Sequence, residues 1–273
     1  KWPFLATIAL MITFIGLANY MNDESTLTLT LTGLGLLLIV IYGWFSYVVR
    51  ESEGGLYDDQ VDMSFRWGMA WFIFSEVMFF AAFFGALYYA RELSLPWLAG
   101  DGSGVSTNQE LWPSFENVWP SNGPANYGGD FVVMKAAGIP ALNTIILLIS
   151  GLTVTWAHHG LKEGKRNQLI LGLIATVLLG FIFVGFQAYE YSHAYNDLNL
   201  KMSSGIYGST FYMLTGFHGF HVTLGAIMLT VILLRCIRGH FSNENHFGFE
   251  AVAWYWHFVD VVWLGLFVFV YWL

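Results

Sequence analysis

Long apolar stretches, separated by polar segments, dominate this chain. Seven of them each hold roughly 20 or more mostly apolar residues, which is the length that a helix needs to cross a bilayer. They cover residues 3–21, 27–49, 66–90, 138–159, 168–192, 207–236 and 248–273. The apolar residues run continuously instead of alternating with polar ones, which favours helices over barrel strands. We therefore predict an all-α integral membrane protein with seven transmembrane helices.

The polar segments between these stretches define the connections. The first is residues 22–25 (NDES), and the second is an acidic connection over residues 51–64. The third covers residues 91–137 and is rich in Gly, Pro, Ser and Asn. It is long enough to fold over the ends of the helices.

Basic residues in the connections predict the orientation of the chain. With the N-terminus inside, the inner segments carry eight Lys and Arg residues and the outer segments carry three. Because Lys and Arg accumulate on the inner side of a membrane protein, we expect the N-terminus inside and the C-terminus outside. Connection 91–137 then lies on the outer side.

Composition supports a membrane protein and excludes several functions. The chain is 56% hydrophobic and only 11% charged, with a mean hydropathy of +0.56, whereas soluble domains are about 25% charged. The net charge of −8 argues against nucleic-acid partners. The single cysteine, Cys236, excludes an internal disulfide framework and a Cys-ligated iron–sulfur cluster.

One acidic residue lies midway along the third apolar stretch. Glu76 is surrounded in sequence by Phe and Met residues. A carboxylate within a bilayer is costly, at least ~2.5 kcal/mol on insertion scales, so it is a functional hypothesis by default. Glu76 is either a proton-related or reactive carboxyl facing a cavity, or a neutral acid that is hydrogen-bonded to another helix.

Two histidines share one face of the sixth stretch. His218 and His221 are three positions apart and therefore project from the same side of a helix. They either hold a metal or haem, or they form hydrogen bonds between helices. We group Glu76, His218 and His221 as a buried polar cluster, because Glu76 could pair with either histidine without any metal.

Other ionisable residues lie at the ends of the fourth stretch and along the last one. His158 and His159 are adjacent, so they point about 100° apart on a helix and do not share a ligand sphere. We interpret them as interfacial. Glu250, His257 and Asp260 form a loose stripe on the last stretch, which we interpret as helix–helix contacts in preference to a catalytic group.

Basic and aromatic residues recur at the predicted inner interface. They are Arg50, Arg66 and Arg235, with Trp44, Trp67 and His240 nearby in the sequence or in the predicted layout. Guanidinium groups bind phosphate, and indole rings lie against glycerol and acyl chains, so this set suits a phospholipid. The alternative is that these residues only set topology and extend to the membrane surface.

Several motifs carry a resemblance to a known family. They are residues 75–80 (SEVMFF), 142–144 (LNT), 155–159 (TWAHH), 205–211 (GIYGSTF), 216–221 (GFHGFH), 246–251 (HFGFEA) and 253–263 (AWYWHFVDVVW). With these motifs, the chain resembles subunit III of the haem–copper cytochrome c oxidases over nearly its whole length.

The resemblance implies a particular arrangement of the seven helices. Residues 1–50 would form a two-helix transmembrane unit, and residues 51–64 a loop on the inner side. Residues 65–273 would form a five-helix bundle with the long outer loop 91–137. A V-shaped cleft that holds lipid would separate the two groups of helices.

The resemblance also implies a function. The chain would be a non-catalytic structural and lipid-binding subunit of a proton-pumping oxidase in the aerobic respiratory chain. It would carry no haem and no metal, bind phospholipid, and pack against the catalytic haem–copper subunit and the other oxidase subunits, which would hold the haem and copper. It would support proton uptake and oxygen access. The lipid-binding residues implied here are Trp44, Arg50, Glu51, Arg66, Arg235 and His240.

The chain departs from the family pattern in two places. It begins at Lys1-Trp2-Pro3 without a His-containing lead, and the loop after Arg91 is longer than in mitochondrial members. The longer loop favours a bacterial inner membrane, with the mitochondrial inner membrane as the alternative.

Overall fold

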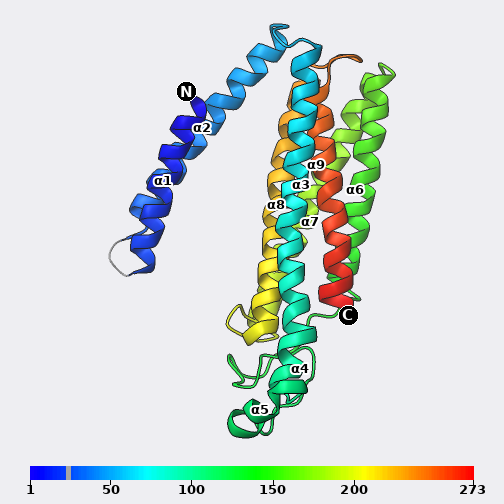
Figure 1. Cartoon of the computed structure of the whole chain (residues 1–273). Helices are drawn as coiled ribbons and strands as arrows, with labels where there is room; N and C mark the ends of the chain where they lie inside the picture. The colour runs from blue at the N-terminus through cyan, green and yellow to red at the C-terminus, as the bar shows by residue number, and fades with distance from the viewer. Residues whose placement is uncertain (23–25) are drawn as a thin grey trace. The chain divides into compact units, whose positions relative to one another are not determined.

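The computed structural model describes residues 1–22 and 26–273, so most of the predicted first connection lies outside the described part. It has seven long helices, namely α1 (Trp2–Met21), α2 (Thr28–Glu53), α3 (Asp59–Tyr89), α6 (Ile139–Lys162), α7 (Arg166–Asn196), α8 (Gly205–Arg238) and α9 (Phe247–Leu266) (Figure 1). All seven, with the π-helical segments that continue α3 and α9, are long and apolar enough to cross a membrane. The prediction of an all-α protein with seven spans is confirmed.

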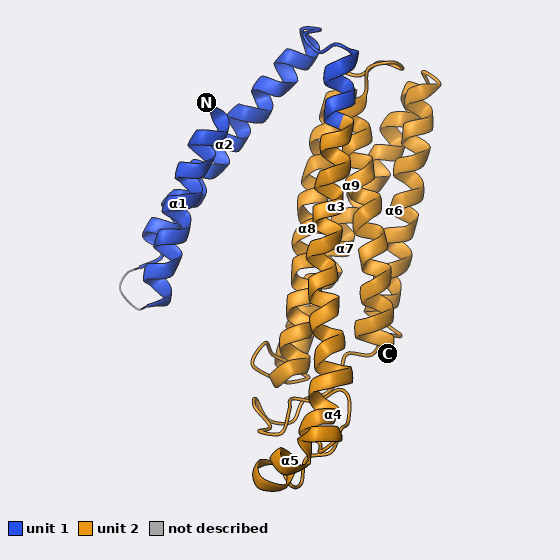
Figure 2. Cartoon of the chain, in the orientation of Figure 1, with its two compact units in different colours: residues 1–65 blue, residues 66–273 orange. Residues whose placement is uncertain are grey.

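The chain divides into two compact units, Lys1–Phe65 and Arg66–Leu273 (Figure 2). We call them the N-terminal unit and the bundle unit. The N-terminal unit contains α1, α2 and the first residues of α3. The bundle unit contains the rest of α3 and the helices that follow it. The V-shaped lipid cleft between two groups of helices stays a prediction.

In the N-terminal unit, α1 and α2 pack side by side along their lengths (Figure 1). The closest approach is at Gly16 and Gly33, where a Cβ atom would overlap the backbone of the opposite helix. Small residues of this kind let transmembrane backbones touch, and the close contact provides the dispersion energy that holds the pair. The outer faces are apolar, and Phe14 and Leu38 are each more than 60% exposed.

The predicted inner loop 51–64 is shorter in the structure, where only residues 54–58 separate α2 from α3. At the start of α3, the Asp58 carboxylate accepts a hydrogen bond from the Val61 N–H at 2.9 Å. Acidic residues in the first turn of a helix are also stabilised by the helix dipole. The acidic residues of 51–64, which predict a loop in the sequence, therefore favour the start of α3 in the structure.

In the bundle unit, α6, α7, α8 and α9 pack closely against one another. Two fully buried tryptophans on α9 fill the centre of this group, and each satisfies its indole N–H across the helices. Trp256 donates to the Ser150 hydroxyl at 2.9 Å, and Trp263 donates to the Thr144 hydroxyl at 2.9 Å. A buried indole N–H without a partner is costly, so these two bonds fix how α6 and α9 align.

Helix α3 joins this group through aromatic rings instead of close backbone approach. Phe79 contacts Phe217 of α8 edge-on at 5.0 Å between ring centroids. Phe80 is 2% exposed and contacts Phe258 of α9 at 6.1 Å. An edge-to-face pair such as Phe79–Phe217 adds about 0.5–1.5 kcal/mol beyond its buried area. The rings place the middle of α3, which includes Glu76, against α8 and α9.

The predicted outer loop 91–137 contains short helical segments. A π-helical segment (Ala90–Ser94) and α4 (Leu95–Leu98) continue α3, and a 3-10 turn (Gly102–Gly104) leads into α5 (Val105–Leu111). The residues after α5 fold back onto the connection between α7 and α8. There the Val132 N–H bonds to the Leu198 carbonyl at 2.9 Å.

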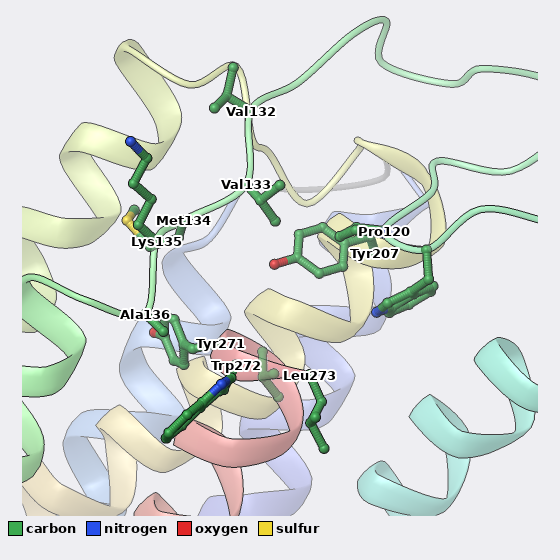
Figure 3. A pocket seen from close by; sticks show the side chains of 12 residues that line it. Pro120, Val132, Val133, Met134, Lys135, Ala136, Tyr207, Tyr271, Trp272 and Leu273 are labelled. Atoms are coloured by element: carbon green, nitrogen blue, oxygen red, sulfur yellow. The ribbon is translucent and has the colours of Figure 1, made fainter.

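A cavity of about 360 Å³ lies between this loop and the C-terminal end of the chain (Figure 3). Its lining includes Pro120, Tyr207 and Trp272. Phe131 stacks on Tyr207 with 5.4 Å between ring centroids, which anchors the loop to the start of α8. The loop and the bundle therefore form one packed surface at this end of the unit.

The contact at Gly33 gives a testable prediction. Gly33→Val should lower the free energy of unfolding by about 1–3 kcal/mol, since the added side chain meets the backbone of α1 at Thr13. The matched control is Gly35→Val on the same helix, where an added Cβ meets nothing within 4 Å. Thermal unfolding of the purified protein in detergent measures both, and equal losses of stability would contradict the close-packed interface.

Candidate functional site

A hydrogen-bonded pair joins α3 to α8 within the spans. The Nε2 atom of His221 lies 2.9 Å from the Oε2 atom of Glu76, and its Nδ1 atom lies 2.6 Å from the Phe217 carbonyl oxygen. A carbonyl can only accept, so Nδ1 carries a proton and Nε2 of a neutral ring accepts. One proton therefore bridges the two side chains, either on the carboxyl or on the imidazole. In both forms the pair has no net charge.

The surroundings of this pair are aromatic. Phe80 contacts the His221 ring edge-on at 5.1 Å, and Tyr255 stacks on it at 6.3 Å. The side chains of Glu76 and His221 are only 21% and 9% exposed. The interpretation of Glu76 as a neutral acid that is hydrogen-bonded to another helix stays a prediction.

His218, the third member of the predicted polar cluster, lies apart from this pair. It is fully buried, and its Nε2 atom donates to the Val259 carbonyl at 3.2 Å. The rings of Phe183 and Trp263 contact it at 5.7 and 5.0 Å. The structure therefore brings Glu76 to His221 and gives His218 a separate hydrogen bond between α8 and α9.

Three predicted lipid-binding residues lie in the bundle unit, around residues 241–250. The Arg66 guanidinium lies 2.5 Å from Glu250 and 5.3 Å from the Phe247 ring. The Arg235 guanidinium lies 4.3 Å from the Phe241 ring. The His240 N–H donates to the Arg235 carbonyl at 3.1 Å. Two cationic groups thus flank the start of α9.

The other three predicted lipid-binding residues lie near the end of α2 in the N-terminal unit. Trp44 is half-buried, Arg50 is exposed, and the Glu51 carboxylate accepts a hydrogen bond from the Tyr57 hydroxyl at 3.0 Å. Burial, together with the Glu51 carboxylate, raises the pKa of Tyr57, so this hydroxyl stays protonated and keeps donating at neutral pH. A single headgroup site built from all six residues stays a prediction.

The structure also reveals a cluster that the sequence reasoning missed. The Oε1 atom of Glu250 lies 3.5 Å from Nε2 of His246 and 3.6 Å from Nε2 of His158. His246 and Glu250 are four positions apart, a spacing that places two side chains on one helix face and could have been noticed. His158 comes from α6, and only the packing of α6 on α9 brings it to the other two.

A second missed residue is an acid near the end of the fifth span. Glu190 is fully buried, and its Oε1 atom accepts a hydrogen bond from the Tyr271 hydroxyl at 2.6 Å. The signal for this residue was present, since it is an acidic residue inside a stretch predicted to cross the membrane. Its bond ties α7 to the C-terminal π-helical segment.

The fold and these sites together define a multi-pass helical membrane protein whose buried polar side chains bond one another across helices. A family model described as "Cytochrome c oxidase subunit III" matches residues 1–100 and 111–273. The chain belongs to this family, and the resemblance drawn from its motifs is confirmed.

Individual relatives agree over almost the whole chain. The cytochrome c oxidase subunit 3 of Carassius auratus is 44% identical over 272 residues, covering 99% of this chain and 93% of the relative. The protein of the same name from Gadus morhua is 43% identical with the same coverage. That of Chondrus crispus is 42% identical over 278 residues, covering 99% and 90%.

Membership of this family places the chain in the cytochrome c oxidase complex, with the other oxidase subunits as its partners. The role in the respiratory chain follows from that complex. The relatives named above carry the name cytochrome c oxidase subunit 3, which gives no location for the enzyme, so a mitochondrial inner membrane also stays a prediction. A bacterial source and the orientation of the termini stay predictions.

The Glu76–His221 pair gives a second testable prediction. Glu76→Gln should leave the stability of the complex nearly unchanged, because the amide N–H can still donate to Nε2 of His221. Glu76→Leu should cost about 1–3 kcal/mol, because it leaves that nitrogen buried without a donor. Thermal dissociation of the purified complex compares the two variants.

Infrared spectroscopy tests the protonation state of the same pair. The difference between wild type and Glu76→Gln should contain the C=O band of a protonated carboxylic acid at neutral pH. A carboxylate band at pH 7 that disappears only on acidification would contradict the neutral acid.

Proposed function

We propose that this chain is a non-catalytic, lipid-binding subunit of a proton-pumping cytochrome c oxidase. In this role it stabilises the catalytic subunit and supports proton uptake and oxygen access, while the haem and copper are held by partner subunits. The proposed location is a bacterial inner membrane, or alternatively a mitochondrial inner membrane, with the N-terminus inside and the C-terminus outside.

The hydrogen bonds of His218 and His221 support a role without a redox centre. A haem or copper ion needs an imidazole nitrogen with a free lone pair and room beside it. Both ring nitrogens of His221 are engaged, by Glu76 and by the Phe217 carbonyl. His218 uses Nε2 for the Val259 carbonyl, and its Nδ1 atom, which has no hydrogen-bond partner among the described residues, is fully buried among the rings of Phe183 and Trp263. Neither histidine suits axial ligation.

The observation that carries the lipid-binding proposal is the placement of Arg66 and Arg235 at the start of α9. Each guanidinium lies over an aromatic ring, at 5.3 Å for Phe247 and 4.3 Å for Phe241. A guanidinium is suited to the oxygens of a phosphate, and rings at the membrane interface suit the glycerol region of a lipid. A phospholipid with its headgroup at this end of the bundle fits both features.

Exposed apolar faces support the other parts of the proposal. Leu152 of α6 and Val261 of α9 are 70% and 67% exposed. In a bilayer such surfaces are covered by acyl chains or by a neighbouring subunit. Oxygen is apolar and would reach the catalytic subunit through such lipid. The hydrogen bond between Glu76 and His221 places two proton-binding side chains together within the spans, which suits a supporting role in proton uptake.

The third prediction tests lipid binding. Arg235→Gln should reduce tightly bound phospholipid by about one molecule per complex, because it removes the charge-assisted hydrogen bonds to the phosphate. The catalytic activity of the same preparation should decay sooner during turnover. Phosphorus analysis and mass spectrometry of washed, purified complex measure the lipid, and oxygen consumption over repeated turnover measures the lifetime.

The matched control is Arg238→Gln, since Arg238 is also in the last turn of α8 and is exposed. It should keep both the lipid and the lifetime of wild type. Retention of all lipid by Arg235→Gln, with an unchanged lifetime, would argue against the proposal. An equal loss of lipid in both variants would show a general effect of positive charge instead of a site.

A further inference from the structure

We propose that His158, His246 and Glu250 form a binding site for a divalent cation of the Zn²⁺ type. These residues belong to three segments of the bundle unit, namely the end of α6, the connection that leads into α9, and the first turn of α9. The site shares the Arg66–Glu250 ion pair with the proposed lipid site, but its argument does not rest on lipid binding, and it concerns a structural ion, not a redox centre.

The first argument is the geometry of the ligand atoms. Zn²⁺ binds imidazole nitrogen and carboxylate oxygen at about 2.0–2.1 Å with tetrahedral angles, so neighbouring ligand atoms are about 3.3–3.4 Å apart. The Oε1 atom of Glu250 lies 3.5 Å from His246 Nε2 and 3.6 Å from His158 Nε2. The three atoms all lie within 4.8 Å of one another. Small side-chain movements would complete three corners of a tetrahedron, leaving the fourth for water.

The second argument is the direction of the lone pairs. Nδ1 of His246 donates to the Ser242 carbonyl at 3.1 Å, so Nε2 of a neutral ring presents a lone pair to Glu250. His246 is only 7% exposed, and its Nε2 has no hydrogen-bond partner in the described part of the chain. The Nε2 atom of His158 is also buried and has no hydrogen-bond partner among the described residues. The lone pair of His246 Nε2 faces a carboxylate oxygen, which is costly unless a positive charge lies between the two atoms. His158 presents a lone pair to the same point in its Nδ1–H tautomer.

The third argument is the support around the ligands. Ligating histidines and carboxylates in proteins are held by further hydrogen bonds that fix their orientation. Ser242 does this for His246, and Phe249 stacks on His158 at 5.2 Å. Arg66 pairs with Oε2 of Glu250 at 2.5 Å, which leaves Oε1 directed at the histidines. Because Arg66 shares the carboxylate charge, we expect weaker binding than at a site without that cation.

The donor set selects the ion. Mg²⁺ and Ca²⁺ prefer oxygen ligands at higher coordination numbers, so two imidazoles and one carboxylate do not suit them. Cu²⁺ accepts imidazole but prefers tetragonal geometry. Zn²⁺ suits three such ligands in a tetrahedral arrangement with one open position. A bound ion would link the end of α6 to the start of α9.

The fourth prediction tests this site in the intact oxidase complex. Purified complex, stripped with a chelator, is titrated with Zn²⁺ alone, and binding is followed by equilibrium dialysis and metal analysis. His158→Gln and His246→Gln should each weaken one site per complex at least ~100-fold, since even loss of a residue that only supports a metal ligand costs 10–100-fold. Zn²⁺ sites in other subunits remain in every variant and cancel in the comparison.

The control variant is His159→Gln, which changes the exposed histidine next to His158. It should bind Zn²⁺ as wild type does, and Mg²⁺ in excess should not displace the ion. The difference between the X-ray absorption spectra of wild type and a ligand variant, both loaded with Zn²⁺, should show two imidazole nitrogens and one carboxylate oxygen. Equal Zn²⁺ affinity and stoichiometry in wild type and both ligand variants would overturn the proposal, as would competition by Mg²⁺.

Folding is checked separately, by the visible spectrum and the subunit composition of each preparation. If one histidine variant fails to assemble, the other decides the outcome, because each removes only one ligand. If neither assembles, X-ray absorption of wild type is recorded for the chelator-stripped complex and again after one equivalent of Zn²⁺ is added, and the difference between the two spectra reports the added ion. Two imidazoles and one carboxylate in that spectrum support the site, and any other ligand set contradicts it.

Discussion

Hydrocarbon offers no hydrogen bonds, so a polar side chain within the spans is stabilised by a partner on a neighbouring element. Glu76 bonds to His221, Tyr271 bonds to Glu190, and Trp263 bonds to Thr144. Each of these bonds joins two different elements. An unpaired polar group is costly in this environment. The bonds therefore fix which faces of the helices meet and at what register.

Packing of two kinds fills the space between these bonds. Gly16 and Gly33 allow the backbones of α1 and α2 to touch, whereas Phe79 and Phe80 connect α3 to α8 and α9 through rings. Close backbone contact gains dispersion energy over a long interface, since lipid tails provide no hydrophobic drive between helices. The aromatic layer leaves α3 farther from its neighbours and places Glu76 at the edge of the bundle unit.

The short segment around the start of α9 combines several roles. Residues 240–250 supply the rings beneath Arg66 and Arg235 and two of the three ligands proposed for a cation. Glu250 connects the two, since one carboxylate oxygen pairs with Arg66 of the proposed lipid site and the other faces the histidines. The proposed lipid and cation sites would therefore be electrostatically linked, although each is tested by its own variants.

The sequence alone determined the all-α class, the seven spans and the oxidase family, because helix length and hydropathy follow from the bilayer and the motifs are local. It also singled out Glu76. Tertiary structure decided which histidine Glu76 would meet, since His218 and His221 share a helix face and differ only in what packs against them. It also decided that residues 51–64 are mostly helical and that His158 joins His246 and Glu250. Such pairings depend on how α6 lies on α9, and periodicity within one helix carries no information about the neighbour that covers it.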